Sequence, residues 1–240
     1  MYHLLRKQVV LFLIILLSCA SQAVAQKELF RRDHDDLTYY FGLTLGYNYS
    51  TLHISKSSLF TQNDSITRVE PGASGGIAMG LMATARLTDH WQIRANPQLI
   101  IGGSKYIAYN LSKTKLGESL FQNQTLPSTL VSIPIQLKFN SDRIGNFRTY
   151  LLGGFKYDYD LSSNSSARNV EDLVKLKASD LGFELGVGFN FYLPFVTISP
   201  ELKLSNGLSN IHQLDPTLKY SNVLDKILSR MIVFSIHFED

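Results

Sequence analysis

The stretch YYFGLTLGYNYSTLHI, residues 39–54, decides the fold class of this chain. Large apolar side chains stand on most of its odd positions and glycine or small polar residues on most of its even positions, a period of two that indicates a β-strand. Residues 181–193, LGFELGVGFNFYL, repeat the pattern. Both stretches exceed the ~5–6 residues usual for soluble strands and reach the ~9–11 residues that a tilted strand needs to cross a bilayer. The alternation therefore predicts membrane-spanning strands.

Eight segments of this kind follow one another: residues 39–54, 72–87, 91–103, 129–140, 147–158, 181–193, 195–205 and 228–238. Tight turns (88–90, 141–146 and the corner at Pro194) alternate with long connections (55–71, 104–128, 159–180 and 206–226). Short turns on one side and long loops on the other are typical of outer-membrane barrels, whose turns and termini lie in the periplasm. We predict an all-β fold, a closed eight-stranded antiparallel transmembrane β-barrel with short periplasmic turns and long extracellular loops.

A soluble eight-stranded barrel such as a lipocalin would show the same alternation with its apolar face inside. Composition favours the membrane alternative, because the polar phase is rich in glycine and poor in charge, which suits a crowded interior: Gly42, Gly46, Gly76, Gly80, Gly102, Gly154, Gly182, Gly186 and Gly188. Aromatic residues gather near the strand ends, where the girdles of membrane barrels meet the lipid headgroups: Tyr39, Tyr40, Trp91, Phe147, Tyr157, Tyr159, Phe191 and Tyr192.

The N-terminus has the layout of a cleaved secretory signal, with Arg6 and Lys7 before an apolar run and Ala25 at the end of an Ala-Val-Ala site. We expect a signal peptide at residues 1–25, a periplasmic tail at 26–38, and an outer-membrane barrel domain at 39–240. An alternative that the sequence leaves open is a lipoprotein with acylated Cys19, the only cysteine. The net charge of +3 is too small to indicate nucleic-acid binding.

Several charged residues fall on the inward phase or close to it: Arg94, Lys138, Arg148, Lys156, Glu184, Glu201 and Lys203. We expect them to form an internal ion-pair network; an ion path is the alternative. Eight strands enclose an interior just wide enough for side chains, so a solute channel is not expected. Pro97, Pro134 and Pro200 each remove a ladder hydrogen bond, and we expect bulges or strand ends there.

The densest charge cluster of the mature chain, Arg31-Arg32-Asp33-His34-Asp35-Asp36, precedes the first strand. Its carboxylates and imidazole could bind a cation. The interpretation that we prefer is a solvated tail that orients the chain at the periplasmic interface or contacts a partner.

A lipid-modifying enzyme would need a histidine beside a nucleophile or carboxylate. The candidates His53, His90, His212 and His237 are scattered and form no such pattern. We therefore predict no catalytic, cofactor-binding or metal-binding residues, no cofactor, no small-molecule substrate and no enzymatic activity.

Several segments together resemble the PorT/SprT family of Bacteroidetes outer-membrane proteins. They are RDHDD (32–36) with YYFGLTLGYNYSTLHIS (39–55), PGASGGIAMGLMATARL (71–87), NPQLIIGGSKYIAY (96–109), SIPIQLKFNSDRIGNFRTYLLGGFKYDYDL (132–161) and PELKLSNGLSNI (200–211). The resemblance implies an outer-membrane location and a role in type IX protein secretion, which is tied to gliding motility in some of these bacteria.

On this basis we expect an accessory or assembly component of type IX secretion that contacts outer-membrane lipid. Protein partners would bind through the Arg31–Asp36 tail and the long loops. A generic barrel anchor or adhesin without a secretion role is the second hypothesis, and a lipid-modifying enzyme is the third.

Overall fold

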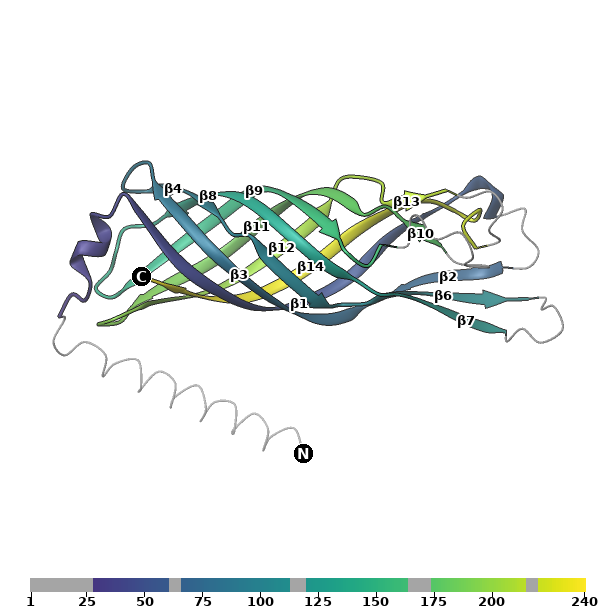
Figure 1. Cartoon of the computed structure of the whole chain (residues 1–240), viewed down its shortest axis with the longest axis horizontal. Helices are drawn as coiled ribbons and strands as arrows, with labels where there is room; N and C mark the ends of the chain where they lie inside the picture. The colour runs from purple at the N-terminus through teal and green to yellow at the C-terminus, as the bar shows by residue number, and fades with distance from the viewer. Residues whose placement is uncertain (1–27, 61–65, 113–119, 164–173, 215–219) are drawn as a thin grey trace, which may run out of the picture.

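Eight antiparallel strands close into a barrel in this computed structural model, which describes residues 28–60, 66–112, 120–163, 174–214 and 220–240 (Figure 1). The closure is seen at β1, which pairs with β14 on one side and with β3 on the other. The order around the ring is β1 (Tyr39–Lys56), β14 (Leu224–Glu239), β12 (Thr197–Gly207), β11 (Ser179–Tyr192), β9 (Phe147–Asp160), β8 (Thr129–Asn140), then β4 (Trp91–Ala95) with β5 (Gln98–Gly102), and β3 (Ser74–Arg86). The predicted fold class is confirmed.

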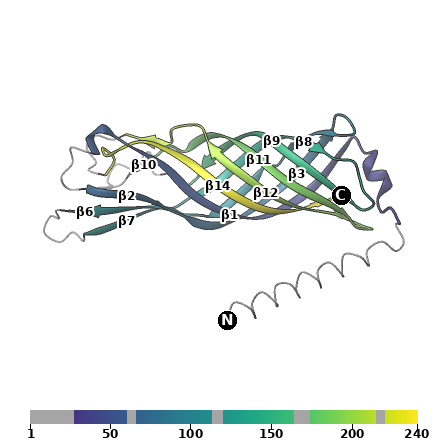
Figure 2. The same cartoon turned by 180° about the vertical axis from the view of Figure 1, so that it is seen from behind.

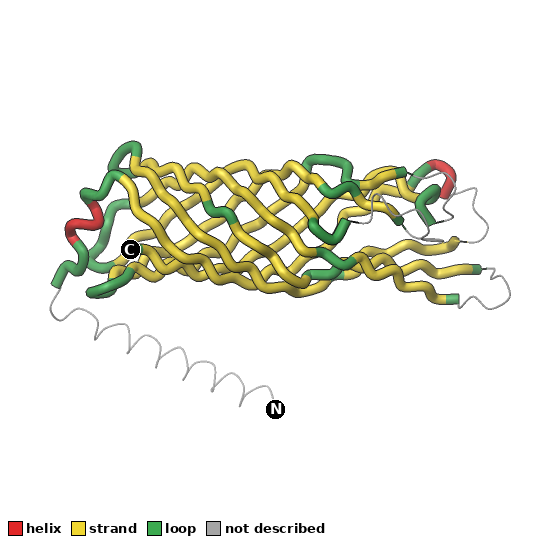
Figure 3. The backbone as a smooth tube through the Cα atoms, viewed as in Figure 1, coloured by secondary structure: helices red, strands yellow, loops and turns green. Residues whose placement is uncertain are grey.

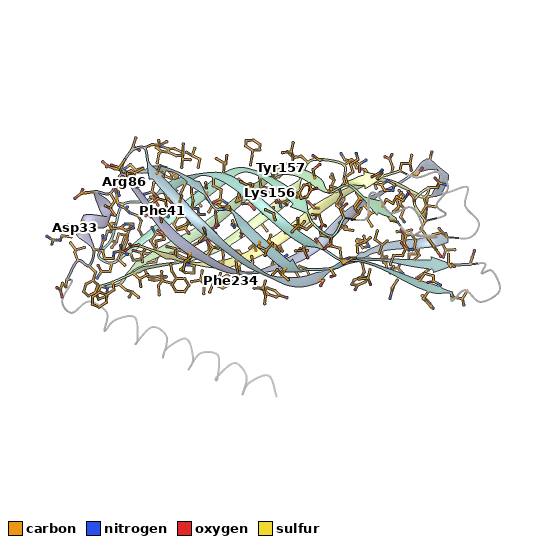
Figure 4. All side chains as sticks on the ribbon, viewed as in Figure 1. Asp33, Phe41, Arg86, Lys156, Tyr157 and Phe234 are labelled. Carbon is orange, nitrogen blue, oxygen red and sulfur yellow. The ribbon has the colours of Figure 1, made fainter. Side chains whose placement is uncertain are left out.

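The pairing of the strands turns their apolar positions outward and their small or polar positions into the barrel, as predicted. Lys156 points into the barrel and its neighbour Tyr157 points away from it, as do Phe41 and Phe234 (Figure 4). Large apolar side chains on the odd positions of β1 are about half exposed, whereas Thr44 and Asn48 on the even positions are buried. A slip of one residue would place the buried charged side chains in lipid, at about 2–4 kcal/mol for each Arg or Lys near the midplane.

The prolines meet the sheet in different ways. Pro97 separates β4 from β5, so the strand end expected there is confirmed. Pro134 and Pro200 lie inside β8 and β12, where no strand ends, which corrects the expectation for these two residues. Pro134 lies beside the break between β4 and β5 at Pro97, and its carbonyl accepts a hydrogen bond from the Asn96 N–H at 3.3 Å. The barrel therefore accommodates two prolines at one interruption of its sheet.

The two ends of the barrel differ. One end, called the turn end here, carries the short turns, both described termini and the short 3-10 helix η2 (Arg32–Asp35) (Figure 2). At the other, the loop end, strands continue beyond the barrel (Figure 3). A three-stranded sheet forms there from β2 (Ile66–Gly72), β6 (Lys105–Leu111) and β7 (Phe121–Leu126), and a small pair from β10 (Lys175–Leu176) and β13 (His212–Gln213).

These strands, the short helix η3 (Ser58–Phe60) and their connections are called the extension below. The long connections predicted as loops are therefore partly β-structure. In the described part of the chain, no helix is long and apolar enough to cross a membrane. The expected signal peptide, with Cys19 and the Ala25 cleavage site, lies outside the described residues.

Candidate functional site

The centre of the barrel is filled by an ion-pair network around Arg94 on β4. Its guanidinium donates to Glu201 Oε2 at 2.5 Å and to Gln136 Oε1 at 2.9 Å, and the Arg94 and Glu201 side chains are fully buried. Tyr150 donates to the same Glu201 oxygen at 2.8 Å. Lys203 Nζ lies 3.5 Å from Glu201 Oε1. The predicted internal network is confirmed at its centre.

Two further contacts extend the network toward neighbouring strands. Gln136 donates to Glu184 Oε2 at 2.6 Å, and Lys138 Nζ lies 3.9 Å above the ring centre of Tyr150. Near the loop end Lys156 contacts Asp158 at 2.5 Å. The network predicted from the sequence did not include His237, Glu239 and Asp158, which are buried in the same lumen. Their inward phase on β14 and β9 was a signal that could have identified them.

Bulky side chains occupy the lumen. The largest fully buried side chains of the described residues include Arg94, Tyr150, Lys138, Lys203, Met82 and His237, all from barrel strands. A cavity of about 20 Å³ beside Asp158 and Asp180 is large enough for a water molecule, which needs at least ~10–15 Å³ of such volume. The interior of the barrel in this structure is a packed polar core.

At the turn end, residues 28–36, called the latch, lie against the barrel. The His34 side chain is buried, with its ring 4.6 Å from that of Tyr40 and 5.9 Å from that of Tyr192. Asp35 accepts hydrogen bonds from Arg143 at 2.7 Å and from Arg148 at 3.2 Å. Arg148 therefore pairs with the latch, which corrects its predicted place in the internal network.

The turn at residues 141–146 and the end of β14 hold the rest of the latch. Arg143 also donates to the Phe30 carbonyl, and Asn146 accepts the Phe30 N–H at 2.9 Å. Arg31 donates to the Glu239 carbonyl at 2.8 Å and lies 3.5 Å from the Asp240 carboxylate. The interpretation of this segment as a solvated tail holds for the exposed residues Arg32, Asp33 and Asp36. It was wrong for Arg31 and Asp35, which are docked by long-range ion pairs, and for the buried His34.

The latch does not assemble the cation site considered from the sequence. His34 points into the barrel end, Asp35 is paired with two arginines, and Asp33 lies on the outer side (Figure 4). Among residues with described positions, no three His, Cys, Asp or Glu side chains converge in a way that could hold a metal ion.

Burial between the two tyrosine rings lowers the pKa of His34 to about 4.

The candidate histidines lie in four different settings. His53 is exposed on β1, His90 lies in a turn with Nδ1 3.1 Å from the Asn140 carbonyl oxygen, and His237 is in the lumen. His212 in the extension has Nε2 3.0 Å from Ser221 Oγ. Ser221 is completely buried, so this serine–histidine pair is closed to solvent in this structure.

The extension has its own apolar core. Ile107 and Tyr109 of β6 are completely buried among residues from β2, β7 and the ends of β1 and β14. Tyr109 stacks obliquely on Tyr220 at 4.7 Å between ring centres. At the start of β7, by contrast, Leu120 is 53% and Phe121 69% exposed. The extension is a packed structure that presents apolar side chains at the start of β7.

The comparison with family models identifies the class of protein. Residues 24–213 match the family described as "Outer membrane protein beta-barrel domain". The chain belongs to this family of outer-membrane barrels. Its place is the outer membrane. Barrels of this kind have their short turns in the periplasm, so we expect the turn end and the latch to lie in the periplasm and the extension to lie outside the cell. No curated protein matches the sequence significantly.

Several solved barrels are similar at low identity. OprG from Pseudomonas aeruginosa has 15% identity and a TM-score of 0.42, with 82% of this chain and 94% of that chain covered. Neisserial surface protein A has 14% identity and a TM-score of 0.40, with 82% and 95% covered. Ail of Yersinia pestis, solved with a heparin analogue, has 12% identity and a TM-score of 0.38, with 85% and 100% covered. Likeness at this level carries no functional argument.

Proposed function

We propose that this outer-membrane barrel is a non-enzymatic anchor that holds the extension at the cell surface for contact with protein partners. The observation that carries the proposal is the combination of a packed lumen with a separately packed extension. A lumen filled by Arg94, Tyr150 and their partners offers no route for cargo. An apolar core outside the membrane around Ile107, with Phe121 exposed at the start of β7, offers a surface for proteins.

The setting that we propose is type IX secretion, in which the barrel would be an accessory component. Support for this setting comes from the sequence resemblance to PorT/SprT proteins in the latch and strand segments. A packed eight-stranded barrel suits a scaffold and not a translocon, because no protein fits inside it.

A clean deletion tests this setting. Cargo proteins with a C-terminal secretion signal are expected to accumulate in the periplasm of the deletion strain, and the complete chain is expected to restore export. A second complementing chain replaces residues 105–126, the β6–β7 hairpin, with a short Gly-Ser linker. It is expected to insert, as judged by altered mobility of the unheated barrel on a denaturing gel, but not to restore export.

Normal export in the deletion strain would contradict the secretion role. The alternative, a surface anchor or adhesin without a secretion role, would then be favoured, and the exposed side chains of the extension would be tested for binding to surfaces.

A further inference from the structure

A groove of about 600 Å³ runs over the lipid-facing surface of β8, β9 and β11. Its walls are apolar side chains, among them Leu137, Phe155 and Leu185. The polar residues beneath it, Gln136 and Glu184, point into the lumen and are buried. The groove therefore presents an almost purely hydrocarbon lining to the membrane.

Gly153 creates the groove. The sheet register places Ile93, Leu137, Gly153 and Leu185 in one row across four strands, so a lipid-facing side chain is missing between Leu137 and Leu185. A Cβ at Gly153 would meet only Leu185 Cδ2, at 3.2 Å, and the Glu184 carbonyl, at 3.9 Å. The slot is open toward the membrane.

Another lipid-facing glycine shows what a filled slot looks like. A Cβ at Gly75 on β3 would lie 2.0 Å from the Tyr47 hydroxyl, because the end of the Tyr47 side chain occupies the space that a Cβ would take. No described side chain lies as close to a Cβ at Gly153. Phe155 instead stands beside the slot with 72% of its surface exposed and forms a ridge along it.

The groove leads toward a cation at the outer edge of the membrane. Phe183, which lines the groove, is the register partner of Asn206 on β12, and Asn206 is the partner of Arg230 on β14. Arg230 Nε donates to Asn206 Oδ1 at 3.1 Å on the exposed surface. Two strand spacings of ~4.8 Å place Arg230 about 10 Å from Phe183.

Arg230 belongs to the lipid-facing phase of β14, two residues beyond Ile232 toward the extension. A lipid-facing arginine costs a large free energy in the hydrocarbon layer and little at the membrane interface. The position of Arg230 therefore marks the outer headgroup region. A guanidinium held by one hydrogen bond retains further N–H groups for a phosphate.

We propose that this surface binds one lipid A molecule of the outer leaflet, with an acyl chain in the Gly153 groove and a phosphate on Arg230. An apolar slot with a cation about 10 Å from its lining residue Phe183, on the side toward the extension, matches a phosphorylated lipid of that leaflet. The missing side chain at Gly153 leaves the atoms that line the slot without van der Waals partners. An acyl chain packed in the slot supplies these contacts. The proposal is independent of any role in secretion.

Native mass spectrometry of the full barrel with added lipid A tests the proposal. Gly153→Leu fills the slot and Arg230→Gln removes the charge; each is expected to reduce retained lipid A about tenfold, the effect of losing one charge-assisted hydrogen bond or a comparable contact. Leu45→Phe adds similar bulk on the opposite strand β1, and Lys226→Gln removes an exposed charge near Arg230 on the same strand. Both controls are expected to bind like the original chain.

Altered mobility of each unheated variant on a gel confirms that it is folded. Unchanged retention in folded Gly153→Leu would overturn the acyl-chain site, and equal loss in Leu45→Phe would show that no specific groove exists. Unchanged retention in Arg230→Gln would overturn the phosphate contact. Phosphatidylglycerol held as tightly as lipid A would overturn the assignment to lipid A.

Discussion

Asp35 and Arg143 are 108 residues apart in the chain and form an ion pair of 2.7 Å at the turn end of the barrel. The arginine also lies 3.7 Å from the ring centre of Tyr192, so it contacts both the latch and β11. One turn of the barrel thus fixes the N-terminal segment over the barrel end.

Asp35→Asn is expected to loosen the latch without unfolding the barrel. The change removes the charge that pairs with Arg143 and Arg148, a loss of about 1–2 kcal/mol for partly buried ion pairs. Hydrogen exchange of the His34 N–H, which donates to the Arg31 carbonyl at 3.2 Å, should become about tenfold faster. Asp36→Asn is the matched control, and equal acceleration in the control would contradict the role of Asp35.

Lower pH is expected to loosen the latch as well. The pKa of His34 is lowered to about 4 in the docked state, while the released histidine titrates near 6.5. The released latch therefore binds more protons, so docking is fully stable above about pH 6.5 and weakens as the pH falls toward about 4. NMR titration of the His34 ring with exchange measurements checks this. A docking equilibrium that does not change between pH 7 and 5 would contradict it.

Arg94→Met is expected to destabilise the barrel by about 3–5 kcal/mol, because it leaves the Glu201 carboxylate buried without its main partner. The double variant Arg94→Met with Glu201→Gln should be more stable than the single variant, since no charge is left uncompensated. Urea unfolding in lipid vesicles measures both. A double variant less stable than Arg94→Met would show that the pair is not a coupled unit.

The neighbouring glycines of β9 are expected to respond differently to alanine. A Cβ at Gly154 would lie 2.2 Å from the Ile135 carbonyl oxygen, so Gly154→Ala must displace backbone and should cost about 1–3 kcal/mol. Gly153→Ala comes close only to the end of the Leu185 side chain, at 3.2 Å, and makes an ordinary contact of 3.9 Å with the Glu184 carbonyl, so it should stay within about 0.5 kcal/mol of the original stability. The temperature at which the folded band disappears on a gel compares the two, and equal shifts would contradict the register.

The barrel could be predicted from sequence because the alternation that defines each strand lies within a short stretch of the chain. In β8 the alternation decides which side chains face lipid, and the predicted segment 129–140 coincides with the strand Thr129–Asn140. The inward position of Arg94 and Glu201 followed from the same parity. Their pairing across the lumen could be expected in kind, since a buried charge needs a partner.

The latch and the extension could not be predicted in the same way. Asp35 docks because Arg143 and Arg148 reach it from a distant turn, and nothing in the sequence around Asp35 indicates this contact. The strand β7 contains FQNQTL, which lacks apolar alternation, and it forms because β6 pairs with it and the core around Ile107 packs under the sheet. Tertiary context determined both elements.

Site-specific photo-crosslinking in living cells tests the central claim most directly, because it asks which surface meets protein partners. A photo-reactive residue at Phe121 in the extension is compared with one at Asp33 on the outer side of the latch. The account predicts discrete crosslinked partner proteins at Phe121 and none of comparable yield at Asp33. Crosslinks confined to Asp33 would contradict it and would place the working surface of this barrel in the periplasm.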